Sequence, residues 1–140
     1  DGVSMKLIAG TAFGLEADVD VLWPTLYIDI NAPAGSIISL PDEHEERALY
    51  IVDGGLEIDG TAVDPLTMAI LKPGSMPVIK ATSDTRVMLC GGKPMDGPRT
   101  VWWNFVASDN ALLEQAKIDW KAGKFDSVPG DDEFIPLPEK

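Results

Sequence analysis

Seven short apolar runs, separated by turn residues, occupy the first hundred positions of this 140-residue chain. Each run is four or five residues long, and most are rich in Ile, Val, Leu or Tyr, which favour β-strands. The runs recur about every ten residues, a spacing typical of a sandwich or barrel rather than of alternating strands and helices. They lie at 6–9, 26–30, 36–40, 48–52, 67–71, 78–81 and 86–90.

A further pair of runs carries the clearest turn signal. Asp59-Gly60 separates 56–58 from 61–63, and Asp-Gly supplies the positive φ angles that a two-residue hairpin turn requires. The prolines in this part of the chain fall between the runs or at their edges, where a missing backbone N–H does least harm. The pattern therefore predicts an all-β fold with antiparallel strands.

After position 105 the hydrophobic period changes to that of a helix. Residues 110–122 place apolar side chains on one face and charged ones on the other, which predicts an amphipathic helix. Its largest apolar side chain is Trp120. Ser108 or Asp109 can cap its start, and Gly123 can end it in a left-handed conformation.

The tail at 128–138 contains three prolines and a glycine, which exclude regular structure. It also carries the large apolar side chains of Phe134, Ile135 and Leu137. One interpretation is a frayed terminus. The other is an extended arm that docks these side chains on a neighbouring domain, because exposing them together is unfavourable. With Trp120, they form the predicted domain interface.

Trp102, Trp103 and Phe105 form the densest aromatic cluster in the sequence. Within a strand, consecutive residues point to opposite faces, so the two tryptophans are expected on different sides. Packing in a core or interface is the main interpretation, and stacking against a ligand is the alternative.

The charge balance limits the partners. The chain has a net charge of −12 and only 11 basic residues, which are scattered, whereas nucleic-acid binding rests on clustered Lys and Arg. No run approaches the ~20 apolar residues that span a bilayer. Cys90 is the single cysteine, so there is no intrachain disulfide, and its apolar neighbours predict a buried structural thiol. We expect a cytoplasmic protein without nucleic-acid or membrane partners.

Four stretches resemble the pirin family, whose members contain two cupin domains. The most specific is a Gly-Gly-x-Pro turn at 91–94 followed by Trp-Trp-Asn-Phe-Val at 102–106. The four stretches are 44–54, 91–106, 114–125 and 129–138. They follow the order of the C-terminal half of the family, and the tail is similar to that of its bacterial branch.

The resemblance implies a jelly-roll-like cupin barrel over 1–106, a helix over 107–125 packed on the barrel or a partner domain, and an extended docking tail over 126–140. Family members are about twice this length. Their N-terminal cupin holds a divalent metal, iron or a similar ion, through three His and a Glu. Some bacterial members are similar to quercetin 2,3-dioxygenases, and animal members act as nuclear co-regulators.

The cupin metal pattern has lost its ligands in this chain. The three His positions and the Glu position fall on Pro41, Glu43, Pro77, and Arg47 or Ala48. The chain has one histidine in all, too few for a cupin site. We therefore expect a metal-free, non-catalytic C-terminal half. Its expected partner is an N-terminal cupin half or a second copy of the chain.

His44 is the one imidazole and has three interpretations. It could bind a metal weakly with Glu43, Glu45 or Glu46. It could be a partly exposed histidine at a strand end, or it could bind a small ligand together with Tyr50 inside the barrel. No residue is assigned a catalytic role, because every nucleophilic constellation would need this same histidine. Enzymatic activity, of the quercetin 2,3-dioxygenase type, is expected only of the longer parent protein.

Overall fold

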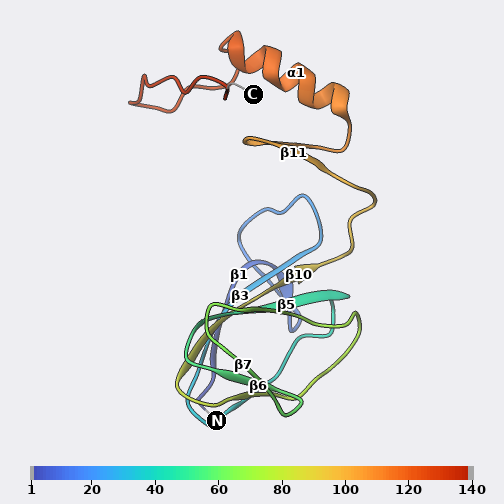
Figure 1. The fold of residues 1–140 in the computed structure, drawn as a ribbon, viewed down its shortest axis with the longest axis vertical. Helices are drawn as coiled ribbons and strands as arrows, with labels where there is room; N and C mark the ends of the chain where they lie inside the picture. The colour runs from blue at the N-terminus through green and yellow to red at the C-terminus, as the bar shows by residue number, and fades with distance from the viewer. Residues whose placement is uncertain (1, 139–140) are drawn as a thin grey trace. The chain divides into compact units, whose positions relative to one another are not determined.

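The structure is a computed structural model that describes residues 2–138. The chain forms two compact units that divide between Pro94 and Met95. The first unit carries strands β1 to β10, and the second carries strands β11 and β12 and helix α1 (Figure 1).

Two antiparallel sheets make up the first unit. The larger has six strands in the order β2-β1-β3-β10-β5-β8, and the smaller has four in the order β4-β9-β6-β7. The strands are β1 (Ser4–Ala12), β2 (Leu15–Glu16), β3 (Thr25–Ala32), β4 (Ile37–Ile38), β5 (Glu46–Asp53), β6 (Leu56–Ile58), β7 (Thr61–Val63), β8 (Met68–Ile70), β9 (Ile79–Ala81) and β10 (Thr85–Gly92). All seven predicted runs contain a strand, which confirms the all-β class.

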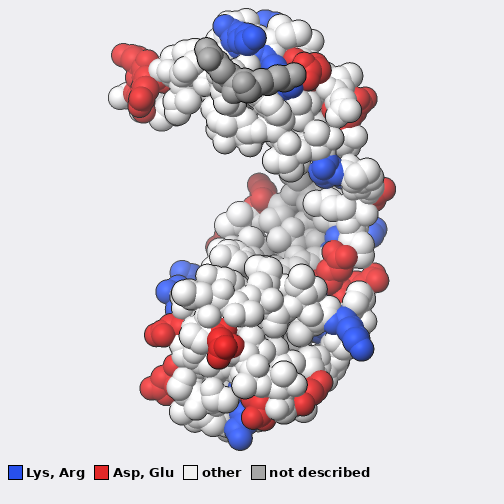
Figure 2. Space-filling model, in the orientation of Figure 1, with Lys and Arg blue, Asp and Glu red and all other residues white. Residues whose placement is uncertain are grey.

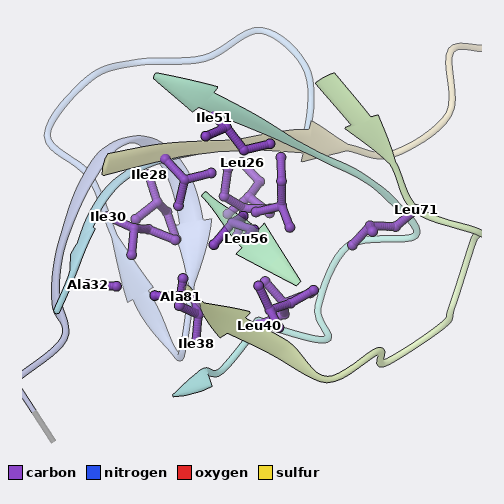
Figure 3. Close-up of a cluster of buried hydrophobic side chains, with 14 of the residues drawn as sticks. Leu26, Ile28, Ile30, Ala32, Ile38, Leu40, Ile51, Leu56, Leu71 and Ala81 are labelled. Carbon is purple, nitrogen blue, oxygen red and sulfur yellow. The ribbon is translucent and has the colours of Figure 1, made fainter. Parts of the chain in front are cut away.

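Branched aliphatic side chains from both sheets fill one shared core (Figure 3). Burial alternates along the long strands, so that Leu49 and Ile51 of β5 are 0% exposed while the residues between and beside them are half-buried. The alternation places every second residue inside. The core side chains drawn and labelled in Figure 3 include Leu26, Ile28, Ile30, Ile38, Leu40, Leu56 and Leu71.

The predicted hairpin turn is present between β6 and β7. Ile58 pairs with Thr61 across it. Asp59 and Gly60 have φ angles of 47° and 79°, which are the left-handed values that this two-residue turn demands. The turn prediction is confirmed.

In the second unit, β11 (Thr100–Trp102) and β12 (Phe105–Ala107) form a hairpin that precedes α1 (Asn110–Lys121). The helix begins and ends as predicted. Asp109 caps it by accepting a 2.8 Å hydrogen bond from the Ala111 backbone N–H, and Gly123 has a φ of 63°. The tail that follows contains no helix or strand as far as Pro138.

The expectation that Trp102 and Trp103 point to opposite sides is wrong. The hairpin turns at Trp103, which has a φ of 51°, so the alternation of a strand does not apply to it. The rings of Trp102 and Trp103 lie edge to face with centroids 6.3 Å apart. Both belong to one aromatic cluster in which Trp120 contacts Trp103, Phe105, Phe125 and Phe134, with ring centroids 5.1 to 6.2 Å apart.

Two surface properties accompany this fold. Among residues 2–138, no helix is long and apolar enough to cross a membrane. On the face seen in Figure 2, basic side chains are spread over the surface instead of forming one patch, and acidic side chains are scattered among them.

Strands β1 and β2 form a hairpin, which we call the first hairpin. Gly10 in β1 and Gly14 in its turn provide a matched test of the fold. Gly10 and Gly14 have φ angles of 78° and 71°, but a Cβ would lie 1.7 Å from the Thr25 carbonyl oxygen at Gly10 and would meet nothing within 4 Å at Gly14. We expect Gly14→Ala to cost about 1–2 kcal/mol of unfolding free energy from left-handed strain. Gly10→Ala should cost about 1–3 kcal/mol more, because the backbones of β1 and β3 must separate.

Denaturant unfolding followed by far-ultraviolet circular dichroism measures both losses. Equal losses for the two variants would contradict the close approach of β1 and β3 at Gly10.

Candidate functional site

Arg47, one of the two residues at which the metal-binding carboxylate is expected, is a buried cation. Arg47 lies in β5, on the same face as Leu49 and Ile51, and is 3% exposed. Its Nη1 donates hydrogen bonds to the Pro41 carbonyl oxygen at 2.8 Å and to Met76 Sδ at 3.0 Å. Its Nη2 donates to the Ser75 carbonyl oxygen.

These acceptors lie at or beside two of the other lost ligand positions. Pro41 occupies the place of the first histidine, and Ser75 and Met76 immediately precede Pro77, which occupies the place of the third. The guanidinium of Arg47 therefore joins the two loops that in a metal-binding cupin would be joined through the ion.

The charge on Arg47 is poorly compensated inside the protein. A guanidinium stays protonated in proteins, and its partners here are two neutral carbonyl groups and a thioether. Its Nε is buried and has no hydrogen-bond partner within residues 2–138. Because burying an uncompensated charge is costly, this arrangement must be held by the surrounding core. Its charge also disfavours a second cation at the same buried position.

His44 lies close to this region and is 6% exposed, so the interpretation of a partly exposed histidine is wrong. Its Nε2 is 2.9 Å from the Thr11 carbonyl oxygen and 3.1 Å from Thr11 Oγ1. A carbonyl oxygen only accepts, so Nε2 must carry a proton and donate it. That nitrogen therefore has no free lone pair for a metal.

Glu43, at the second lost histidine position, is likewise tied to the first hairpin. Its Oε1 accepts a 3.0 Å hydrogen bond from the Gly14 backbone N–H. Backbone N–H groups of Glu43 itself and of Gly14 hold the pKa of this carboxyl below its usual range, because they stabilise the charged form.

The residues at the cupin ligand positions do not fit a divalent metal. Within residues 2–138, no group of three or more His, Cys, Asp or Glu side chains is placed to hold an ion. The residues at these positions are Pro41, Glu43, Arg47 or Ala48, and Pro77, and the carboxylate of Glu43 accepts a hydrogen bond from the backbone.

Tyr50, the predicted companion of His44 in ligand binding, belongs to the outer face of the larger sheet. It lies between Leu49 and Ile51, which point into the core, and it pairs with Met88 and Met68 on the neighbouring strands. The interior beside it is filled by side chains that are 0% exposed. A role for His44 and Tyr50 in ligand binding stays a prediction.

The predicted interface residues belong to the second unit. Trp120 is half-buried in the aromatic cluster, and its Nε1 donates a 2.8 Å hydrogen bond to the Ile135 carbonyl oxygen. This bond fastens the tail to α1. The side chains of Phe134 and Ile135 are exposed, and Leu137 is half-buried. Their contact with another domain stays a prediction.

The sequence interpretation missed the role of Arg47. The sequence does contain a signal for this role. Arg47, Leu49 and Ile51 are spaced two residues apart, so in a strand their side chains all point to the same side, which is the core. A charged residue at an inward position is rare and normally has buried partners. Those partners come from loops 6 and 28 residues away, which no local pattern reveals.

Comparison with known proteins gives a consistent family assignment. Residues 27–126 match the model of the pirin C-terminal cupin domain. A pirin-like protein of Caulobacter vibrioides is 46% identical over 140 residues, which is 99% of this chain and 48% of that protein. A pirin-like protein of Solanum lycopersicum is 31% identical over 130 residues, covering 89% of this chain and 45% of that protein.

The solved structures show the same fold. A crystal structure of a quercetin 2,3-dioxygenase from Acinetobacter baumannii is similar over 100% of this chain and 48% of its own length, with a TM-score of 0.83 and 25% identity. The cupin fold is confirmed. The chain spans about half the length of the curated relatives it matches.

The hydrogen bonds of Arg47 make its replacement costly. We expect Arg47→Lys to lower the free energy of unfolding by about 2–4 kcal/mol, because one ammonium cannot reach acceptors on both loops and leaves buried carbonyl groups unpaired. Arg86→Lys is the control. Arg86 is a paired arginine whose side chain is 52% exposed, so Arg86→Lys should cost clearly less stability than Arg47→Lys.

Chemical denaturation of both variants measures the difference. A loss at Arg47 no larger than that at Arg86 would show that the guanidinium does not hold the two loops.

The lowered pKa of Glu43 predicts an acid-dependent contribution to stability. A carboxyl with a folded pKa below its unfolded value stabilises the protein above the unfolded pKa, about 4.3, and loses that effect as the pH falls through the folded pKa. Glu43→Gln should therefore reduce the fall in melting temperature between pH 6 and pH 3. The fall should not vanish, because Arg86 also lowers the pKa of Asp29.

Glu45→Gln, at an exposed neighbouring position, serves as the control. If Glu43→Gln and Glu45→Gln change the pH dependence equally, the backbone hydrogen bonds to Glu43 have no special role.

Proposed function

Because the chain belongs to the pirin family, as the C-terminal cupin domain of that family, we propose that it is a non-catalytic, metal-free half. Its function is to support a metal-dependent N-terminal cupin in a longer protein. The observation that carries the proposal is the guanidinium of Arg47, which joins the loops at the lost ligand positions.

The side chains available as metal ligands also support a metal-free role for this chain. A cupin metal site needs several imidazoles, and the single imidazole of this chain donates to a backbone carbonyl through Nε2. The fixed positive charge of Arg47 opposes a cation at the same place. A barrel whose interior is filled by side chains contributes rigidity and surface instead of an active-site cavity.

A filled barrel can still be indispensable to a neighbouring domain. Contacts made only in the folded state stabilise both partners by linkage, and a rigid neighbour can exclude water from one wall of an active site. In this proposal the divalent metal, iron or a similar ion, is held in the N-terminal half and supplies its redox chemistry there. This chain supplies none of the ligands.

A second candidate function concerns the parent protein. The similarity of the whole chain to a quercetin 2,3-dioxygenase favours a parent that oxidises a flavonol or a similar enediol-bearing compound with O₂. The two candidates are compatible, since the first describes this chain and the second describes the longer protein.

Measuring the bound metal, with and without the N-terminal half, tests the first proposal. The chain is joined, as one polypeptide, to the N-terminal half of the Caulobacter vibrioides relative, the part that this chain does not match. We expect plasma mass spectrometry to find bound iron or a similar divalent metal in the joined protein and none above background in this chain alone. Oxygen uptake with quercetin should likewise be detected in the joined protein and not in this chain alone.

The melting temperature of the N-terminal half should also rise in the joined protein, because folding of each half stabilises the other. Stoichiometric metal or oxygen uptake in this chain alone would overturn the proposal of a metal-free half. An N-terminal half whose stability does not change on joining would overturn the supporting role.

A further inference from the structure

We propose that the outer face of the six-stranded sheet is the surface that the N-terminal cupin half covers. The inference rests on the proposed function and deepens it, because it replaces an unspecified contact with one defined face. We call this surface the outer sheet face. It consists of Tyr27, Ala48, Tyr50, Met68, Ile70, Met88 and Cys90.

The first observation is that two of the central strands, β5 and β10, are apolar on both sides over most of their length. In β5 the inward residues Leu49 and Ile51 alternate with Ala48, Tyr50 and Val52. In β10 the inward Val87 and Leu89 alternate with Met88 and Cys90. An antiparallel sheet with one face in water normally alternates apolar and polar residues, whereas strands buried on both faces read as continuous apolar runs.

The second observation is that these outward residues form one continuous surface. Pairing across the strands gives one row of Tyr27, Cys90, Ala48 and Ile70. The adjoining row is Asp29, Met88, Tyr50 and Met68. Side chains that are directly opposite on neighbouring strands touch, so the two rows make a single patch and not scattered exposed groups.

The exposure of the patch is unusual for such side chains. Ile70 is 82% exposed, Met68 is 52% exposed and Tyr27 is 38% exposed. Other apolar side chains are also exposed, such as Leu22 and Leu66 in loops, but a contiguous apolar surface on one sheet face marks an interaction site. Tyr and Met are also among the residues enriched in protein interfaces.

The third observation is the low charge of this face in a chain with a net charge of −12. The one carboxylate in the two rows, Asp29, accepts two hydrogen bonds from Arg86 at 3.0 and 2.8 Å. Arg86 offsets the charge of Asp29, and Lys6 of β1, which pairs with Asp29, adds one exposed positive charge at the border of the patch. Depletion of net charge at the centre of a surface is characteristic of the core of an interface.

The occupant is a second cupin half and not a second copy of this chain. Each curated relative named above contains about as much sequence again as this chain matches, so in those proteins a half of similar size accompanies the matched half in one polypeptide. Covalent linkage gives that half a high effective concentration at the face. Two copies of this chain would bring together two bodies of charge −12, which repel each other.

Cysteine accessibility tests the proposal. Ile70→Cys places a thiol on the outer sheet face, and Ile37→Cys places one at a 52% exposed position of β4 in the other sheet. The probe is iodoacetamide. The native Cys90 on the outer sheet face is half-buried, and burial raises its pKa, so it serves as a slower internal reporter. Both variants are made in this chain alone and in the polypeptide that joins it to the N-terminal half of the Caulobacter vibrioides relative.

We expect both introduced thiols to react freely in the chain alone. In the joined protein, alkylation at Ile70→Cys should slow by about tenfold or more, as for a surface that is open in about a tenth of the molecules or fewer. Alkylation at Ile37→Cys should not change. Cys90 should be protected together with Ile70→Cys.

A variant that breaks the proposed contact provides a second test. Ile70 is exposed in this chain, so Ile70→Lys should leave the chain folded with an unchanged melting temperature. In the joined protein it should restore the alkylation of Cys90 and lower the melting temperature of the N-terminal half. Ile37→Lys is the matched control and should do neither.

Each outcome has a distinct meaning. Free alkylation at Ile70→Cys in the joined protein, with the N-terminal half still stabilised by this chain, would overturn the assignment of the face and leave the supporting role intact. Protection of Ile70→Cys in the chain alone would also overturn it, because the second unit or another copy would then cover the face. Neither protection nor stabilisation in the joined protein would overturn both proposals.

Discussion

The burial of Leu49 and Ile51 between the two sheets fixes the rest of this structure. Side chains along a strand point alternately to its two faces. Because Leu49 and Ile51 face the core, Arg47 must also face inward and Tyr50 must face outward. A shift by one residue would reverse every side chain of β5 at once. The buried cation and the apolar outer sheet face are therefore two consequences of a single register, set by the packing of aliphatic groups.

Arg47 shows how a barrel of this kind can keep its loops in place without a metal. An ion would draw together charged or lone-pair donors from side chains, whereas a guanidinium draws together carbonyl oxygens of the backbone. The backbone offers such acceptors whatever the side chains are, which fits the prolines at two of the lost ligand positions. The result is a buried charge with one N–H that finds no partner among residues 2–138, and the surrounding packing must offset it.

Local signals predicted most of the fold. The strands, the Asp59-Gly60 turn, the cap at Asp109 and the end of the helix at Gly123 all depend on residues within a few positions of each other. The partners of Arg47 and His44 lie 6 to 33 residues away, so the sequence alone could count the missing ligands but could not show what replaced them. At Trp103 the strand pattern failed because the hairpin turned one residue earlier than the alternation assumed.

The placement of the aromatic residues makes the two units optically distinct. Of the four tryptophans, Trp102, Trp103 and Trp120 lie in the aromatic cluster of the second unit. The barrel contains Trp23 alone, whose indole N–H donates to the Lys93 carbonyl oxygen. Intrinsic fluorescence therefore reports mainly on the helix, the hairpin and the tail. Loss of the β-barrel would be seen chiefly in the amide signal, so the two units carry separate spectroscopic signatures within one short chain.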